Sequence, residues 1–300
     1  MLDEGRRYVT DGGLETDLIF HCGVELPEFA AFPLVEEPRG RALLADYYDG
    51  YADIARRAGV GLMLEAPTWR ANPDWGERLG YDAAALDRVN REAIALLDER
   101  READADLHDR GVLVGGTIGP RGDGYVAGER LTPEEYADYH RPQLASFRAA
   151  GADLATALTL VGADEAIGIV AAARDVGLPI AVSFTVETDG RLADGVSLGE
   201  AITAVDAVQP PDWFLVNCAH PTHVARGLAD DGPWDRIAGL RPNASRLSHA
   251  ELDEAEALDE GDPVELAASV AAIADRLPGL QILGGCCGTD TRHVAALWRV

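Results

Sequence analysis

Residues 280–288, Leu-Gln-Ile-Leu-Gly-Gly-Cys-Cys-Gly, decide the fold, because they contain the last of eight short apolar runs along the chain. The runs are nearly unalternated, as is typical of strands buried on both faces of a parallel sheet. We predict strands at residues 8–12, 61–65, 112–117, 154–158, 179–184, 213–217, 236–241 and 280–284. The eighth run matters most, because eight strands are what a closed α/β barrel needs.

Helical patterns, in which apolar residues recur every three or four positions, separate the predicted strands. They cover residues 41–58, 83–108, 133–150, 164–176, 198–208 and 264–277. This rhythm predicts an α/β protein with the (βα)8 TIM barrel fold, as a single domain over residues 1–300. A doubly wound open sheet is the alternative, but it would favour a phosphate-binding fingerprint after the first strand, and the sequence has none there.

The composition excludes some partners. The 300 residues carry a net charge of −26, with 52 acidic residues against 26 basic ones, all arginine. Such a surface would repel nucleic acid and anionic lipid. The charge is spread along the whole chain, which favours a halophilic protein whose self-repulsion is screened by salt. The sequence contains no run of about 20 apolar residues and no signal-peptide pattern, so we expect a cytoplasmic protein with no membrane partner.

Three of the four cysteines lie where predicted strands end. Cys218 follows the run at residues 213–217, and Cys286 and Cys287 follow the last run. The ends of barrel strands meet at one rim, and three thiolates there would form a zinc site with an open fourth position. Cys22 lies outside this set. Buried apolar cysteines or a vicinal disulfide are the alternatives.

The two adjacent cysteines need an unusual backbone to share a metal ion. Neighbouring side chains on a regular strand point to opposite faces. Gly284, Gly285 and Gly288 supply the freedom to turn around the pair. A zinc ion with three thiolates carries a net charge of −1, which suits the activation of a substrate thiol. A site built from three histidines would instead favour hydrolysis by metal-bound water.

Three motifs resemble those of the zinc-dependent homocysteine S-methyltransferase family. They are Asp-Gly-Gly-Leu-Glu-Thr at residues 11–16, Asn-Cys at 217–218 and Gly-Gly-Cys-Cys-Gly at 284–288. The resemblance spans essentially the whole chain. It implies a (βα)8 barrel, Zn²⁺ on Cys218, Cys286 and Cys287, and methyl transfer from a small activated donor to a thiol acceptor, with homocysteine giving methionine.

The resemblance also implies how the acceptor is bound. Asp11 would bind the substrate amine, and the backbone N–H groups around Gly12 and Gly13 would bind its carboxylate. The family has a Glu-Thr pair after the fourth strand, whose Glu holds the amine, whereas this chain has Leu158 there. Glu65, at the end of the second predicted strand, is the best substitute, and Glu187 is the second.

Other residues near the predicted strand ends have less specific signals. Asn217 and Asn243 could bind substrate or form turns. His220 and His223 could complete the zinc site, support a ligand or cap the next helix. Trp69 and Trp75 could stack over a cationic methyl donor or simply pack in their loop.

The sequence leaves several alternatives open. One is a zinc-binding or thiol-binding barrel without turnover. Another is methylation of a different thiol, because of Leu158, and a zinc hydrolase is a weaker third. The donor is open among S-methylmethionine, S-adenosylmethionine, betaine and a methylated corrinoid protein.

Overall fold

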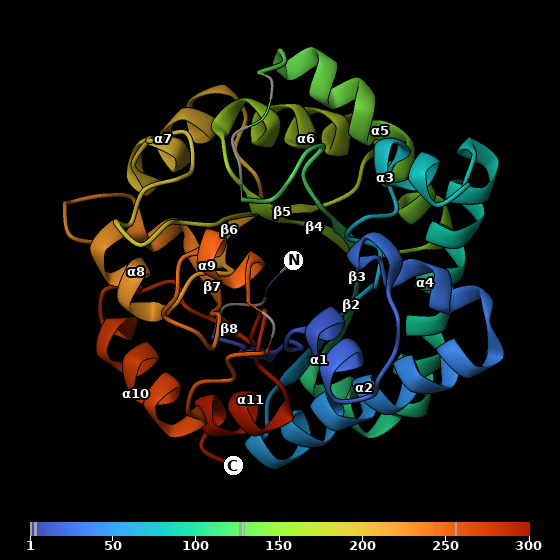
Figure 1. Cartoon of the computed structure of the whole chain (residues 1–300), viewed down its shortest axis with the longest axis horizontal. Helices are drawn as coiled ribbons and strands as arrows, with labels where there is room; N and C mark the ends of the chain where they lie inside the picture. Colours follow the sequence, from blue (N-terminus) through green and yellow to red (C-terminus); the bar gives the residue numbers. More distant parts are fainter. Residues whose placement is uncertain (1, 3–4, 126–127, 129, 256) are drawn as a thin grey trace.

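The computed structural model describes residues 2, 5–125, 128, 130–255 and 257–300, and these form a closed barrel of eight parallel strands in the order β1 to β8. Figure 1 shows the barrel from one end, with helices forming an outer ring. The strands are β1 (Tyr8–Val9), β2 (Gly61–Glu65), β3 (Val112–Ile118), β4 (Leu154–Leu160), β5 (Ile180–Phe184), β6 (Trp213–Asn217), β7 (Ile237–Arg241) and β8 (Ile282–Leu283). The predicted barrel is therefore confirmed, and the open sheet is wrong.

All six predicted helices are present. They are α2 (Pro38–Ala58), α4 (Ala83–Ala103), α5 (Pro133–Ala150), α6 (Ala163–Val176), α7 (Leu198–Val208) and α10 (Pro263–Ala274). The predicted helix at 83–108 is too long, because α4 ends at Ala103 and a 3₁₀ turn, η3 (Ala105–Arg110), follows. The predicted strands at the two chain ends are also too long, since β1 and β8 each keep two residues in the ladder.

Five short helices among the described residues were not predicted, because each has only about two turns or fewer, too little for a periodic pattern. They are α1 (Leu14–Phe20), α3 (Pro73–Arg78), α8 (Pro221–Gly227), α9 (His249–Asp253) and α11 (Thr291–Trp298). The 3₁₀ turns η1 (Pro27–Phe29), η2 (Phe32–Glu36) and η4 (Trp234–Arg236) are shorter still. Helices α1 and α9 matter for function, because they lie in the long connections from β1 to α2 and from β7 to α10, near the barrel axis in Figure 1.

The barrel interior is apolar at one end and polar at the other. A compact inner cluster fills the end of the barrel opposite the carboxyl ends of the strands. Its members include Tyr8, Met63, Leu154, Trp213, Leu215 and Ile282. A much larger cluster lies between the strands and the ring of helices. Charged and polar residues such as Glu65, Asn217 and Arg241 are buried at the carboxyl ends of the strands. This end is where α/β barrels build their active sites.

Two irregularities in strand pairing bring side chains into that end. The β4–β5 register shifts between Ala157 and Leu160, and Thr159 has a φ of 63°. Leu158 and Thr159 therefore both line the barrel mouth, although they are adjacent. The β6–β7 register shifts between Phe214 and Leu215, and after it Arg241 points inward. Bulges that re-aim side chains are common next to active sites.

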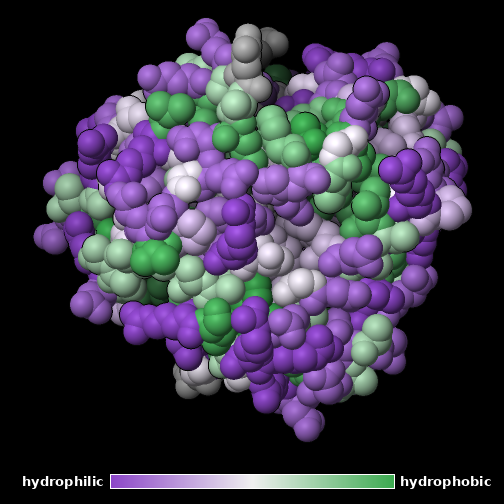
Figure 2. All heavy atoms as spheres, turned by 60° about the horizontal axis from the view of Figure 1, so that its bottom comes forward, coloured by the Kyte–Doolittle hydropathy of each residue, from purple (hydrophilic) through white to green (hydrophobic). Residues whose placement is uncertain are grey.

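The surface is strongly polar, as the composition predicts. Figure 2 shows hydrophilic side chains covering most of one face, with smaller apolar patches between them. Among the described residues, we find no helix with the length and apolar character needed to cross a bilayer.

Candidate metal centre and active site

Three sulfur atoms converge at the carboxyl end of the barrel. Cys218 directly follows β6, and Cys286 and Cys287 follow β8. Their Sγ atoms all lie within 4.8 Å of one another, and those of Cys218 and Cys287 are 3.7 Å apart. A tetrahedral zinc site with Zn–S bonds of about 2.3 Å needs sulfurs about 3.8 Å apart. The donor set and its spacing therefore fit zinc, as the sequence predicted, and Cys22 lies outside the cluster.

The glycines around the cysteine pair make the turn possible. A Cβ on Gly285 would lie 2.0 Å from Thr289 Oγ1, and one on Gly284 would lie 2.5 Å from the Asp11 carbonyl oxygen. Gly288 has a φ of 78°, in the left-handed region that favours glycine. The Thr289 N–H donates to the Cys286 carbonyl at 3.0 Å, which closes the turn and lets both sulfurs face the same point.

The pKa values of the three cysteine thiols are shifted in different directions. Hydrogen bonds from Cys218 and Cys287 lower the pKa of Cys286 well below its usual range. Hydrogen bonds with Cys218 and then with Cys286 raise the pKa of Cys287, and the hydrogen bond with Cys286 is the largest cause of the raised pKa of Cys218. One thiolate is thus stabilised by two thiols, an arrangement that a bound cation would convert into three thiolates.

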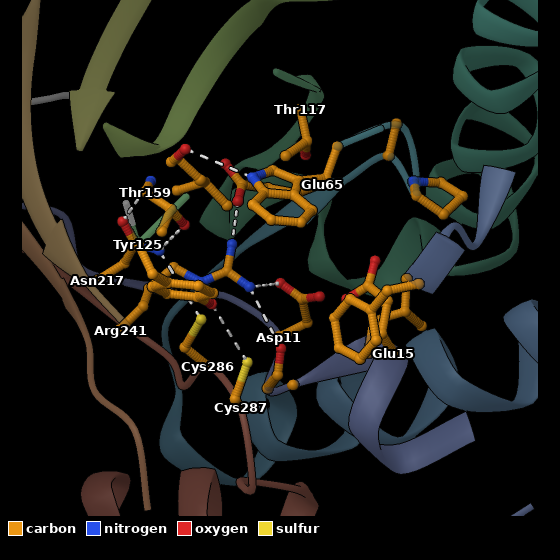
Figure 3. A pocket seen from close by; sticks show the side chains of 18 residues that line it. Asp11, Glu15, Glu65, Thr117, Tyr125, Thr159, Asn217, Arg241, Cys286 and Cys287 are labelled. Atoms are coloured by element: carbon orange, nitrogen blue, oxygen red, sulfur yellow. Dashed lines mark hydrogen bonds and ion pairs between the residues drawn. The ribbon is translucent and has the colours of Figure 1, made fainter. Parts of the chain in front are cut away.

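Tyr125, from the loop after β3, covers the sulfur cluster. Its hydroxyl oxygen lies 3.0 Å from Cys218 Sγ. The same oxygen lies 4.0 Å from Cys287 Sγ, as Figure 3 shows. Its ring stacks on His249 of α9, with the ring centroids 4.3 Å apart. His249 in turn lies 2.6 Å from the Cys218 carbonyl oxygen through Nε2. The loop after β3 and helix α9 thus contact each other over the cysteines.

A cavity of about 60 Å³ opens beside the sulfurs, and we call it the strand-end chamber. It is lined mainly by residues from the ends of strands, including Asp11, Glu15, Glu65, Leu158, Thr159, Asn217, Arg241, Cys286 and Cys287. About 10–15 Å³ is enough for one water molecule. The chamber therefore fits a ligand of a few heavy atoms beside the cysteines.

Arg241 organises the charged wall of this chamber. Figure 3 shows its guanidinium group between the carboxylates of Asp11 and Glu65. Its Nη2 donates to Asp11 Oδ1 at 2.6 Å, its Nη1 donates to Glu65 Oε2, and its Nε donates to the Gly285 carbonyl at 3.0 Å. All three charged groups are buried. Arg241 was not predicted as a site residue, although it ends its strand as Glu65 does.

Burial and pairing act in opposite directions on these groups. Burial raises the pKa of Asp11 and of Glu65, while the Arg241 charge opposes both shifts. For Arg241, burial favours the neutral form, but the two carboxylates outweigh it and its pKa is raised. Glu65 Oε1 is buried and has no hydrogen-bond partner in the part of the chain that the structure describes. The cluster thus carries two carboxylates, one guanidinium and an unused acceptor.

The first-strand motif contributes backbone and a further carboxylate. A Cβ on Gly12 would lie 2.6 Å from the Tyr51 hydroxyl, and one on Gly13 would lie 2.5 Å from the Cys286 carbonyl, so both positions require glycine. The Gly13 N–H already donates to the Thr289 carbonyl at 2.9 Å. Glu15, at the start of α1, lines the chamber and is partly buried. Burial, with smaller contributions from Cys286 and Asp11, raises its pKa to about 7.

Asn217 is held by several protein groups. Its Oδ1 accepts from the Thr159 N–H at 2.8 Å and from the Ser183 hydroxyl at 2.7 Å. Its Nδ2 donates to Thr159 Oγ1 at 2.8 Å and lies 3.7 Å from Cys286 Sγ. The Asn-Cys motif thus links the bulge in β4 to the sulfur cluster.

A second and larger cavity of about 270 Å³ adjoins the first, and we call it the loop chamber. Phe29, Trp69, Tyr125 and Cys287 line both chambers. The other walls come from loops, α1 and α9, and include Arg70, Asp123, Asn243, Ser245, His249 and Asp259. The two chambers therefore meet at one of the three sulfurs.

Comparison with known proteins identifies the family. Residues 8–300 match the sequence model described as Homocysteine S-methyltransferase. The chain belongs to the homocysteine S-methyltransferase family. The family resemblance seen in the sequence is therefore confirmed.

Relatives in the family cover nearly the whole chain. A homocysteine S-methyltransferase of Escherichia coli (strain K12) is 26% identical over 322 residues, which cover 99% of this chain and 96% of the relative. Crystal structures of the homocysteine methyltransferase MmuM from Escherichia coli match this fold, with TM-scores of 0.79 for the oxidized form and 0.75 for the metallated form. Each is 22% identical and is covered to 97%, with 99% of this chain aligned.

The remaining candidates of the sequence lie around this site. The His220 side chain accepts from the Thr222 N–H and caps α8, one of its expected roles. His220 and His223 are not part of the sulfur cluster. Trp69 lines both chambers, but Arg70 and Arg78 stack on Trp75, with guanidinium carbons 3.6 and 4.5 Å from its ring centre. Trp75 lines neither chamber.

Proposed function

We propose that this protein is a zinc-dependent methyltransferase that moves a methyl group from a small activated donor to the thiol of homocysteine, giving methionine. One observation supports this above all: a cluster of three cysteine sulfurs includes Cys287, which lines both of the adjoining cavities. A two-substrate transfer needs both reactants at one centre, held in line. Cys218, Cys286 and Cys287 would hold the zinc ion, which, when bound, keeps an acceptor thiol in its nucleophilic, deprotonated form.

We assign the acceptor to the strand-end chamber. Its volume of about 60 Å³ suits a small amino acid more than a large donor. Asp11, Glu65 and Arg241 together carry a charge of −1 when both carboxylates are ionised, so the wall attracts an ammonium group. Glu65 Oε1, which is buried and unpaired, is the acceptor that the amine would satisfy. This assignment would compensate for Leu158, and Glu15 adds a third carboxylate to the same chamber.

We assign different supporting roles to Gly12, Gly13 and Asn217. The turn at Gly12 and Gly13 brings backbone close to the sulfurs, and its N–H groups that are not bonded to Thr289 would bind the acceptor carboxylate. Asn217 would orient Cys286 and border the bound acceptor. Polar groups that orient metal ligands are often as important as the ligands.

We also propose that the protein works in the cytoplasm at high salt. Free thiols within 4.8 Å of one another would oxidise in an oxidising compartment, and a reducing one keeps them as metal ligands. The net charge of −26 supports a surface adapted to strong ionic screening.

Zinc analysis and a donor panel test this function. We expect about one zinc ion per chain, because one three-sulfur site fits it. Zinc-loaded protein should methylate homocysteine with at least one of S-methylmethionine, S-adenosylmethionine, betaine or a methylated corrinoid protein. Cys287→Ser should lose the zinc and more than about 100-fold of the activity. The control Cys22→Ser, at an exposed cysteine away from the cluster, should keep both. Retained zinc without methylation of any thiol would instead support a binding protein.

A further inference from the structure

The two chambers each contain an arginine, and these arginines differ in their partners. Arg241 forms ion pairs with two carboxylates in the strand-end chamber. Arg70 lines the loop chamber, and no carboxylate of the described residues forms an ion pair with it. Many surface arginines of this acidic chain are ion-paired, such as Arg56 and Arg88. An arginine that lines a cavity without a carboxylate partner is therefore informative.

Arg70 is held in place by aromatic and backbone contacts rather than by an ion pair with a described carboxylate, although Asp123 of the same chamber acts on its charge from a longer distance. Its guanidinium carbon lies 3.6 Å from the ring centre of Trp75 and 5.0 Å from that of Trp69. Its Nη1 donates to the Glu28 carbonyl at 2.7 Å, while its Nε is buried and has no hydrogen-bond partner among the described residues. Buried donors without partners are rare in folded proteins. Because aromatic stacking fixes the orientation of the planar Arg70 guanidinium group, the binding site for a ligand anion is already formed.

The rest of the loop chamber indicates where the other end of such a ligand lies. Trp69, Phe29 and Tyr125 line the boundary with the sulfurs, and Asp123 lines the chamber near Tyr125, whose N–H it accepts at 2.8 Å. Aromatic faces and a carboxylate attract a positively charged methyl-bearing centre. Arg70 attracts a negative group. The chamber therefore suits a zwitterion whose cationic end faces Cys287.

We propose that Arg70 binds a carboxylate of the methyl donor in the loop chamber and thereby selects donors that carry one. This inference rests on the proposed methyl transfer. Its donor class is a sulfonium or quaternary ammonium compound with a carboxylate. During transfer the bond from the methyl carbon to the donor atom breaks, and its electron pair stays on that atom. The new bond forms to the acceptor sulfur, and the carboxylate is unchanged.

The unchanged carboxylate determines the kinetic signature. Arg70 would contact it equally in the bound donor and in the transition state, so this contact contributes uniform binding. Losing it should raise the KM for the donor and leave kcat nearly constant. A charged hydrogen-bonded pair of this kind corresponds to a change of about 10- to 100-fold.

The experiment compares two donors and two variants. The donors are S-methylmethionine and its amide, in which a neutral group replaces the carboxylate. The variants are Arg70→Gln and Arg78→Gln. Arg78 also stacks on Trp75, but it is exposed, pairs with Glu28 and lines neither chamber, so it is a matched control. Thermal unfolding of the zinc-loaded proteins verifies that each variant is folded.

We expect Arg70→Gln to raise the KM for S-methylmethionine about 10- to 100-fold, with kcat within about twofold. The amide should be a poor donor for the wild type, and its KM should not change in Arg70→Gln. Arg78→Gln should behave like the wild type with both donors. Equal effects of Arg70→Gln on both donors, or a wild type that uses both donors equally well, would overturn the inference while leaving the methyltransferase function intact.

A binding measurement separates this inference from the function on which it rests. Calorimetry with zinc-loaded protein should detect S-methylmethionine binding to the wild type and to Arg78→Gln, with about 10- to 100-fold weaker binding to Arg70→Gln. If no donor methylates homocysteine but this pattern holds, the proposed function fails and the carboxylate site stands. Binding that is absent from the wild type, or unaffected by Arg70→Gln, overturns the carboxylate site.

Discussion

The strand-end chamber and the loop chamber are both lined by Cys287, but the arginine in each chamber has different partners. In the strand-end chamber, Arg241 is buried between Asp11 and Glu65, so its charge is already compensated by the protein. In the loop chamber, Arg70 is stacked on tryptophans and has no carboxylate partner among the described residues. The Arg241 charge is paired within the protein and forms a fixed wall of its chamber. The Arg70 charge can form an ion pair with a ligand.

This contrast separates a structural arginine, Arg241, from one that is available to a ligand, Arg70. A buried charge that loses its partner is strongly destabilising, because it cannot be rehydrated. Replacing a charged residue that forms no ion pair in the folded protein should change the free energy of unfolding much less. The stability of the protein should therefore depend on Arg241, and its choice of ligand should depend on Arg70.

The largest expected effect comes from removing the fixed wall. Arg241→Met would leave Asp11 and Glu65 buried together without a counter-ion, and should lower the free energy of unfolding by about 3–5 kcal/mol. Arg70→Met should cost about 1 kcal/mol or less, because it removes stacking and one hydrogen bond to a carbonyl. Urea unfolding of the zinc-loaded proteins measures both.

A second substitution is the control for this comparison. Adding Glu65→Gln to Arg241→Met removes one of the two unpaired charges and should recover part of the lost stability. Equal losses for Arg241→Met and Arg70→Met would contradict the division into a structural and a ligand-binding arginine.

Glu15 gives an intermediate effect, with a defined pH dependence. The folded protein keeps the Glu15 proton up to a pKa of about 7, whereas the ordinary value is 4.5. The unfolded chain therefore binds fewer protons between these values, and the wild type loses stability as pH rises from 4.5 to 7. Glu15→Gln escapes this loss, and above pH 7 its free energy of unfolding should exceed that of the wild type by about 1–3 kcal/mol.

Urea unfolding at pH 5 and pH 8 measures the effect of Glu15→Gln. The gain should be small at pH 5 and larger at pH 8, and the KM for homocysteine should rise if Glu15 binds the acceptor amine. Glu25→Gln, at an exposed carboxylate outside both chambers, should change the free energy of unfolding by less than about 0.5 kcal/mol at either pH. A gain that is the same at both pH values would exclude Glu15 titration as its cause.

The sequence predicted the barrel and the sulfur cluster for a physical reason. Strands buried on both faces must be apolar along their whole length, so their ends are visible wherever polar residues or glycines begin. The same rule marks the positions of Glu65 and Cys218, and it could have marked Arg241, which ends β7. The partners of these residues were not visible, because ion pairs such as Glu65 with Arg241 join strands far apart in the sequence.

The loops were harder to predict. Tyr125 lies in an irregular segment, and only folding brings its hydroxyl to within 3.0 Å of Cys218 Sγ. The bulge that places Leu158 and Thr159 together in the strand-end chamber depends on the pairing of β4 with β5, which no local pattern encodes. Arg70 was not predicted, because the lack of an ion pair with a described carboxylate becomes visible only in the folded structure.

The smallest expected effect tests whether the loop chamber also contains a fixed charged wall. His249 lies 2.6 Å from Glu187 Oε1 through Nδ1 and 2.6 Å from the Cys218 carbonyl oxygen through Nε2. Glu187→Gln keeps an acceptor for the ring, so kcat/KM should fall by about tenfold at most, with zinc content unchanged. His249→Ala removes the contact with Cys218 and the stacking on Tyr125, and should cost about 10- to 100-fold. Steady-state rates and zinc analysis of both variants measure this difference. If Glu187→Gln is as damaging as His249→Ala, the ion pair itself holds Cys218 in place, and the two chambers are more alike than Arg70 and Arg241 indicate.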